Sequence, residues 1–129
     1  MAGRALLDTS AAAALLRGDG AASEKLRAVD EAYTSVVVLG ELLYGARHSA
    51  NVAGNLEHVA AFAAAIVALP VDQETAEVYA RIKQVLRTKG RPIPDNDLWI
   101  ASSAIQHELA LLHRDAHFEE IDELVHETW

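Results

Sequence analysis

The chain has 129 residues, of which 51% are hydrophobic, and a formal net charge of −8 at pH 7. This length and composition are typical of one domain with its own core, so we expect a single domain over residues 1–129. The sequence has no cysteine, which excludes disulfides and thiolate metal sites, and its acidity argues against simple electrostatic binding of nucleic acid, because phosphates are repelled.

The first half of the chain is expected to alternate strands and helices. In order, the pattern predicts a strand over Arg4–Asp8, a helix from Thr9 or Ser10 to about Arg17, a short helix over Ser23–Val29, a strand over Thr34–Val38, a helix over Leu39–Arg47 and an amphipathic helix over residues 52–66. Gly18 and Gly20 are expected to end the first helix. The β-branched run TSVVV is typical of a buried parallel strand.

The second half continues the same alternation. It predicts a strand over Ile66–Pro70, a long helix capped by Asp72 and running through Lys89, a helix over residues 96–107, a strand over Leu109–His113 and a final helix over Ala116–Leu124. The inner face of the long helix is expected to carry Val78, Ile82, Val85 and Leu86. Apolar strands alternating with helices predict an α/β fold in which both faces of a parallel sheet are covered.

The segment PIPDNDLWIASSA places two aspartates, Asp95 and Asp97, directly before an apolar run. Helix capping explains one of them well, since Pro94 can open a helix and a nearby Asp can accept a free backbone N–H group. Capping explains two aspartates less well. The remaining acids of the chain therefore decide how the segment is interpreted.

Acidic residues recur where strands end or helices begin. Asp8 closes the first strand, Glu41 follows the TSVVV strand, Asp97 opens a helix, and Asp115 follows the LALLH strand. The carboxyl ends of parallel strands share one edge of a sheet, so these side chains are expected to converge. Taken alone, Asp8 and Asp115 are better explained as helix caps. Glu41 is harder to explain in this way, because it stands among apolar residues and a buried unpaired carboxylate is costly; a surface position on an amphipathic helix is the alternative.

Convergent carboxylates repel one another by about 4 kcal/mol per pair at 4 Å and an effective dielectric of 20. A divalent cation removes that repulsion, and Mg²⁺ or Mn²⁺ prefers such oxygen ligands. A bound ion of this kind also activates water and neutralises charge on a phosphoryl group. The sequence therefore predicts a divalent metal centre at this edge. No histidine is assigned to it, because none repeats at ligand spacing on one helix face.

The motifs LLDTSAAAALL, VVVLGELLYGAR, PIPDNDLWIASSA and LALLHRDAHFEEI resemble those of PIN-domain ribonucleases, above all the VapC-type toxins of bacterial toxin–antitoxin pairs. The resemblance extends from Leu6 to about Ile121. It implies a three-layer α/β/α sandwich with a central, mainly parallel sheet of four to five strands, in which the last edge strand is short or absent.

The resemblance also implies the roles of individual residues. Asp8 and Asp97 would hold Mg²⁺ or Mn²⁺, with Glu41 and Asp115 acting through water, in a Mg²⁺- or Mn²⁺-dependent cleavage of RNA. Asp95 is then a loop or cap residue. Many relatives have Thr or Asn at the position of His113; here a buried strand residue with a satisfied ring is the simpler interpretation.

Residues that contact substrate and partners are expected near this site. Thr9 and Ser10 are candidates for supporting Asp8, and the basic segment RIKQVLRTKGR offers a strip that would guide phosphates, in which the candidates are Arg87, Lys89 and Arg91. A solvated helix face explains the strip equally well. The resemblance further implies a homodimer and a VapB-type antitoxin, in a heterotetramer or larger assembly. Leu15, Leu16, Leu42 and Tyr44 are candidates for the antitoxin groove, or for the core.

Three other readings stay open. An aspartate-based phosphohydrolase needs an acid two residues after Asp8, where this chain has Ser10. A phosphoacceptor signalling domain needs a lysine after a late strand, where this chain has Arg114. A catalytically inactive, partner-binding relative is the third. No apolar segment approaches the ~20 residues that span a bilayer, and an early aspartate argues against a secretory signal, so we expect a cytoplasmic protein.

Overall fold

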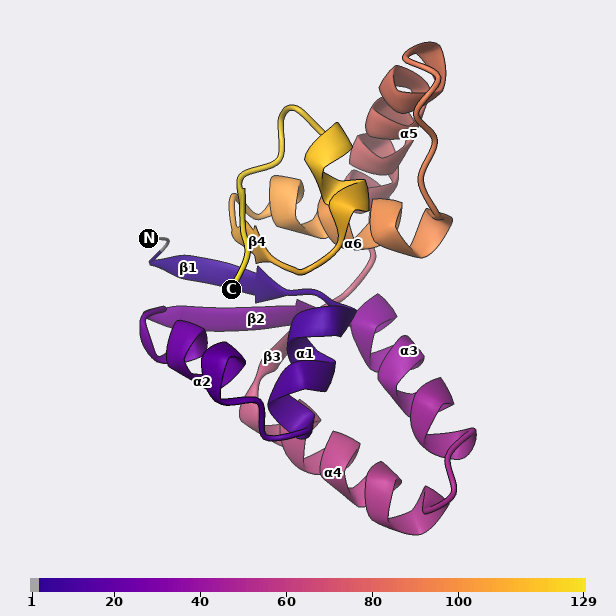
Figure 1. Ribbon diagram of the computed structural model, residues 1–129. Helices are drawn as coiled ribbons and strands as arrows, with labels where there is room; N and C mark the ends of the chain where they lie inside the picture. Colours follow the sequence, from indigo (N-terminus) through magenta and orange to yellow (C-terminus); the bar gives the residue numbers. More distant parts are fainter. Residues whose placement is uncertain (1–2) are drawn as a thin grey trace.

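Five short strands form the central sheet of the protein, in the order β3-β2-β1-β4-β5. The structure is a computed structural model that describes residues 3–129 (Figure 1). In chain order the elements are β1 (Arg4–Leu7), α1 (Thr9–Leu16), α2 (Gly20–Arg27), β2 (Glu31–Ser35), α3 (Val36–Arg47), α4 (Val52–Ala65), β3 (Val67–Leu69), α5 (Gln73–Thr88), α6 (Asp95–Gln106), β4 (Ala110–Leu112), the 3₁₀-helix η1 (Ala116–Glu120) and β5 (His126–Glu127).

Every pair of neighbouring strands in this sheet is parallel, and β1 lies at its centre. Leu6 is in register with Tyr33 of β2 on one side and with Leu111 of β4 on the other. The strands therefore end at a common edge, where β1 leads into α1 and β2 leads into α3 (Figure 1). This register confirms the predicted parallel sheet and brings the chain segments after β1, β2 and β4 together.

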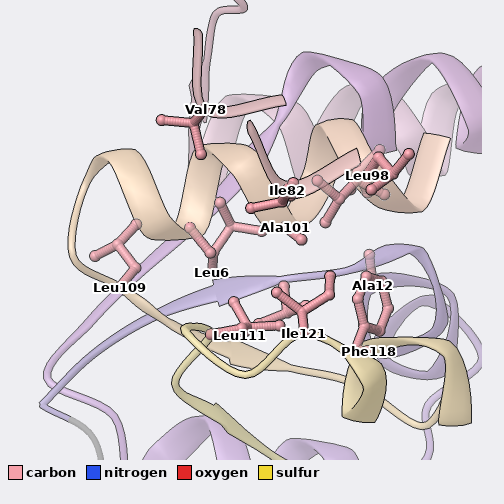
Figure 2. Packing of buried hydrophobic residues seen from close by; sticks show 14 of the residues in the cluster. Leu6, Ala12, Val78, Ile82, Leu98, Ala101, Leu109, Leu111, Phe118 and Ile121 are labelled. Atoms are coloured by element: carbon pink, nitrogen blue, oxygen red, sulfur yellow. The ribbon is translucent and has the colours of Figure 1, made fainter. Parts of the chain in front are cut away.

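Helices cover both faces of the sheet, which gives the three layers that were predicted. Leu6 and Leu7 are adjacent in β1 and therefore point to opposite faces, yet both are fully buried. Leu6 belongs to the larger core cluster with residues of α5 and α6, as Figure 2 shows for Ile82 and Ala101. Leu7 packs with α1 and α2 on the other face. A strand that is buried on both faces must be apolar throughout, as RALL is after its first residue.

The second strand and the third helix begin earlier than predicted. The TSVVV run was expected to be a strand, but β2 ends at Ser35 and α3 starts at Val36. Ser35 caps the helix, because its Oγ accepts the Val37 N–H at 3.0 Å. Val38, fully buried, then packs into the core from a helix instead of a strand. The cap and the core contact outweigh the β-propensity of three valines.

Two further boundaries differ from the predictions. Only Gly18, with a φ of 77°, ends α1, because Asp19 immediately caps α2 by accepting the Ala22 N–H at 3.0 Å. The final helix was predicted over Ala116–Leu124, but the chain forms a short 3₁₀-helix and then the edge strand β5. The two-residue β5 pairs with β4, so the expected short edge strand is present.

Helix α5 packs against α6 through one apolar stripe. Thr75, Val78, Ile82 and Leu86 are buried, whereas Val85, also predicted on the inner face, is half exposed. Asp72 caps the helix as predicted, accepting the Thr75 N–H at 3.0 Å. Within residues 3–129 the protein contains no helix long and apolar enough to cross a membrane.

Candidate active site

The four acids expected at one edge of the sheet come from four different segments of the chain. Asp8 directly follows β1, Glu41 lies in the second turn of α3, Asp97 lies in the first turn of α6, and Asp115 follows β4. Their charges act on one another: Asp97 and Asp115 both raise the pKa of Asp8, and Asp115 and Glu41 both raise the pKa of Asp97. The parallel register thus brings together acids that are distant in sequence.

Asp8 is the most buried of the four, with 3% of its surface exposed. Its Oδ1 accepts the Ala11 N–H at 2.8 Å, so it caps α1, and the Ser10 hydroxyl donates to it at 2.7 Å. Burial, reinforced by the charges of Asp97 and Asp115 and opposed by these hydrogen bonds, raises its pKa to about 6. Asp8 therefore both caps α1 and belongs to the acid cluster. A nearby cation would favour its ionised form.

Asp95 and Asp97 belong to different surroundings although both lie in the first turn of α6. Pro94 occupies the N-cap position without a side-chain hydrogen bond, so neither aspartate caps α6. The prediction that Asp95 is a loop or cap residue is wrong, because Asp95 is the first residue of the helix. Asp95 accepts hydrogen bonds from Tyr79 at 2.9 Å and from Lys83 at 3.0 Å. Asp97 faces the acid cluster, and burial first, then the neighbouring carboxylates, raise its pKa.

Glu41 is held by a hydrogen bond from the neighbouring helix. The Thr9 hydroxyl donates to its Oε1 at 2.5 Å and so joins the start of α1 to α3. Glu41 is partly exposed, which avoids the cost of a buried unpaired carboxylate. Thr9 and Ser10 were both considered as supports for Asp8, but only Ser10 contacts it; Thr9 supports Glu41 instead.

A histidine that the sequence analysis assigned no metal role lies among these acids. The Nδ1 atom of His117 is 2.9 Å from Asp97 Oδ2 and 3.1 Å from Asp115 Oδ1. One potential ligand atom from each of the three residues lies within 4.8 Å of the others. The signal that could have found His117 is its position two residues after Asp115, in the turn that Asp115 caps by accepting the His117 N–H at 2.9 Å.

His113 is buried beside Asp115 and both of its ring nitrogens have partners. Its Nδ1 accepts the Asp115 N–H at 3.1 Å, which leaves the ring proton on Nε2, 2.8 Å from Nδ1 of His126. Burial, followed by the charge of His126, lowers the pKa of His113. The sequence favoured a buried residue with a satisfied ring, and these two contacts agree with that interpretation. The hydrogen bond from the Asp115 N–H also shows that the ring holds the backbone of a site residue in place.

The basic strip, which covers the second half of α5 and the turn after it, is largely engaged in ion pairs at the surface. Arg81 pairs with Glu123, Lys83 with Asp95, Lys89 with Asp122 and Arg91 with Glu120. Arg87 makes no ion pair with the residues in the described range 3–129 and lines a small hollow with Pro92 and Ile93. Exposed pairs of this kind contribute little to stability, so a phosphate could compete for these cations. Their role as a phosphate-guiding strip stays a prediction.

An apolar groove adjoins the acid cluster. It is a cavity of about 470 Å³ between α1, α3 and α4, and Thr9 and Glu41 lie at its border with the acid cluster. Of the residues predicted for a partner groove, Leu16 and Leu42 line it. Leu15 packs against the smaller core cluster, and Tyr44 lines a neighbouring hollow with Val37 and Gly40. The groove therefore joins an apolar surface to the acidic site.

Known proteins resemble this chain in both sequence and fold. "Ribonuclease VapC5" of Mycobacterium tuberculosis is 34% identical over 109 residues, which cover 78% of this chain and 81% of that protein. The VapBC-5 structure from the same organism has 31% identity and a TM-score of 0.79, covering 98% of this chain and 97% of the other.

A third relative is the DNA-bound VapBC of Salmonella typhimurium, whose matching chain has 26% identity and a TM-score of 0.90, covering 100% of this chain and 99% of the other. These matches agree with the five-stranded parallel sheet and with the motifs from which the resemblance was inferred. The family model of the PIN domain matches residues 5–124, nearly the whole chain, and the chain belongs to that family.

Proposed function

We propose that this protein is an endoribonuclease that hydrolyses RNA phosphodiester bonds with Mg²⁺ or Mn²⁺, and that it acts as the toxin of a VapBC-type toxin–antitoxin pair. The observation that carries the proposal is the convergence of Asp8, Glu41, Asp97 and Asp115 at the carboxyl edge of a PIN-domain sheet. The names of the curated relatives, which are ribonucleases, support the substrate class.

The donor set fits a small divalent cation. Carboxylate oxygens are the ligands that Mg²⁺ and Mn²⁺ prefer. Burial first, and the neighbouring carboxylates after it, raise the pKa of Asp8 and Asp97, and a bound cation would favour their ionised forms. We propose Asp97 and Asp115 as direct ligands of the ion, because their donor atoms lie close together. This proposal revises two expectations: that Asp8 is a direct ligand, and that Asp115 acts through water. When bound, the ion neutralises charge on the phosphoryl group and lowers the pKa of water.

The chain's own residues hold these acids in position. Ser10 and the Ala11 N–H fix the Asp8 carboxylate, and Thr9 fixes Oε1 of Glu41. The second oxygen of Glu41 is then available to accept the proton of the attacking water. Water attacks the phosphorus and the bond to the 3′ oxygen breaks. The 3′ oxygen takes up a proton from solvent, so the products carry 5′-phosphate and 3′-hydroxyl ends.

The antitoxin would occupy the apolar groove between α1, α3 and α4. Because Thr9 and Glu41 are among the residues that line this groove, an amphipathic segment lying in it can extend a basic side chain toward the acids. The net charge of −8 favours such a basic partner. The VapBC complexes among the structural relatives support a VapB-type partner. Homodimers within a heterotetramer or larger assembly are part of the same proposal.

The function is tested with Asp8→Asn, which keeps the shape of the side chain and can still cap α1. Purified wild-type protein should cleave RNA in the presence of Mg²⁺ or Mn²⁺ and lose that activity with EDTA. The variant should lose about 100-fold or more in rate, as when a charge-stabilising group is removed from an active site. Undiminished cleavage by the variant would overturn the assignment, and inactivity of a folded wild-type protein would favour a partner-binding role.

A further inference from the structure

We infer that His117 is a direct ligand of the metal ion in this centre, and that its imidazole makes the site prefer Mn²⁺ to Mg²⁺. This inference rests on the proposed function, since it presumes that a divalent ion binds at the acids. It goes beyond that function because it adds a nitrogen ligand to a set otherwise made of carboxylates and states which ion the centre favours.

The first argument is the spacing of the donor atoms. The Nδ1 atom of His117 is 2.9 Å from Asp97 Oδ2 and 3.1 Å from Asp115 Oδ1. Neighbouring ligands at right angles around an ion with bonds of about 2.1 Å lie roughly 3 Å apart. The three donor atoms thus have a separation at which one ion can contact them all, and no backbone rearrangement is needed to bring them there.

The second argument is how the histidine ring is placed. Asp115 caps η1 by accepting the His117 N–H at 2.9 Å, so the turn itself brings the residue to the site. The side chain is about half exposed and makes no core contact comparable to those of Phe118, the next residue, which is fully buried. The imidazole is therefore not required for packing of the core. Asp97 and Asp115, the two carboxylates that face it, are stabilised by a positive partner.

The ring is also ready to exchange its present contacts for an ion. Between two carboxylates, Nδ1 carries the proton and donates it. When an ion binds, the ring can carry its proton on Nε2 instead and offer the Nδ1 lone pair to the ion. Nδ1 faces the two carboxylates without the ion and would also be the ligand atom when the ion is bound, so the ring need not turn to bind the ion.

The choice of ion follows from the chemistry of the ligand set. Mg²⁺ favours oxygen ligands and retains water, while imidazole nitrogen increases the affinity for transition metals. Mn²⁺ accepts both kinds of ligand. Replacing His117 by a residue with only an amide should therefore weaken Mn²⁺ binding more than Mg²⁺ binding. We expect the preference for Mn²⁺ to fall about tenfold, at the lower end of the effect of changing groups around a metal.

The test measures Mn²⁺ binding to the intact chain without RNA, after removal of metal with EDTA. Electron paramagnetic resonance gives the affinity for Mn²⁺, competition with Mg²⁺ gives the preference, and its pulsed form detects a ¹⁴N nucleus coupled to the ion. The variant is His117→Gln. The matched control is His58→Gln, since His58 is an exposed histidine that lines the groove next to Glu41.

Wild type and His58→Gln should show ¹⁴N coupling, and His117→Gln should lose the coupling together with the Mn²⁺ preference. Bound Mn²⁺ without ¹⁴N coupling in the wild type would overturn the inference and leave the proposed function intact. Persistence of the ¹⁴N coupling in His117→Gln would also overturn the inference and leave the proposed function intact. Absence of any bound Mn²⁺ would overturn both. Because the wild-type spectrum alone decides whether nitrogen is a ligand, the test does not depend on the folding of the variant.

Discussion

Asp95 and Asp97 lie two residues apart in the first turn of α6, and their surroundings act on them in opposite directions. Asp95 is at the surface, where hydrogen bonds from Lys83 first and Tyr79 second lower its pKa. Asp97 faces other carboxylates, and burial first, then those charges, raise its pKa. The surface cluster pairs its aspartate with Lys83, whereas at the edge of the sheet several carboxylates gather around the His117 ring, where the proposed divalent ion would bind.

The sharpest way to break this comparison is to neutralise each aspartate separately. Asp97→Asn should lower RNA cleavage by about 100-fold or more, because it removes a direct ligand and charge from the centre. Asp95→Asn is the matched control, with the same chemical change on the same turn, and should stay within about twofold of wild type. Initial rates on one RNA with Mn²⁺ decide the point, and equal losses in both variants would contradict the distinction.

The second test concerns the buried support of the acidic edge. His113→Leu removes the acceptor of the Asp115 N–H and the hydrogen-bond partner of His126. We expect the free energy of unfolding to fall by about 2 kcal/mol, because two polar groups lose their hydrogen-bond partners. His113→Asn should recover part of this loss, because an amide oxygen can accept the N–H two residues on. Urea denaturation measures both, and an unaffected His113→Leu would contradict the positioning role.

The third test uses the pH dependence of Asp8 in metal-free protein. Its pKa is raised from 3.8 to about 6, so the folded state prefers the neutral carboxyl. The folded state is therefore penalised progressively as pH rises between these two values, and the penalty is complete above the higher one and absent below the lower one. Asp8→Asn lacks this penalty and should be more stable than wild type at pH 7.5 by about 1–2 kcal/mol.

The difference between the two proteins should shrink toward pH 4, which thermal denaturation in EDTA at several pH values can measure. Added Mn²⁺ should then stabilise wild type more than Asp8→Asn, because the ion offsets the same repulsion. If the difference in stability between wild type and Asp8→Asn does not change with pH, the pKa of Asp8 is not raised in the folded state.

The smallest effect is expected from the surface region. Lys83→Gln removes the cation that pairs with Asp95 and that lies over the Tyr79 ring. Both partners are exposed, so the free energy of unfolding should fall by about 0.5 kcal/mol or less and the difference should diminish at high salt. Denaturation at low and high ionic strength measures it. A loss above about 1 kcal/mol would mean that this cluster organises the start of α6 more strongly than its exposure suggests.

Patterning predicted most of the architecture because it is a local property. Alternating apolar strands and helices predicted the parallel sheet covered on both faces, Gly18 correctly marked the end of α1, and Asp72 correctly marked the start of α5. The errors fell where a tertiary contact or a cap outweighed local propensity. Ser35 started a helix inside a run of valines, and the chain after Asp115 formed a single 3₁₀ turn followed by an edge strand.

By itself, the sequence determined which acids follow which strands, and the rule that parallel strands end together was enough to predict that Asp8, Glu41, Asp97 and Asp115 would meet. Only the tertiary structure decided the details of that meeting: Ser10 contacts Asp8 while Thr9 contacts Glu41, Asp95 turns to Lys83, and His117 joins Asp97 and Asp115. The reason is physical. Local patterns indicate which acid follows which strand, but the direction of a side chain at a junction depends on neighbours that are distant in sequence.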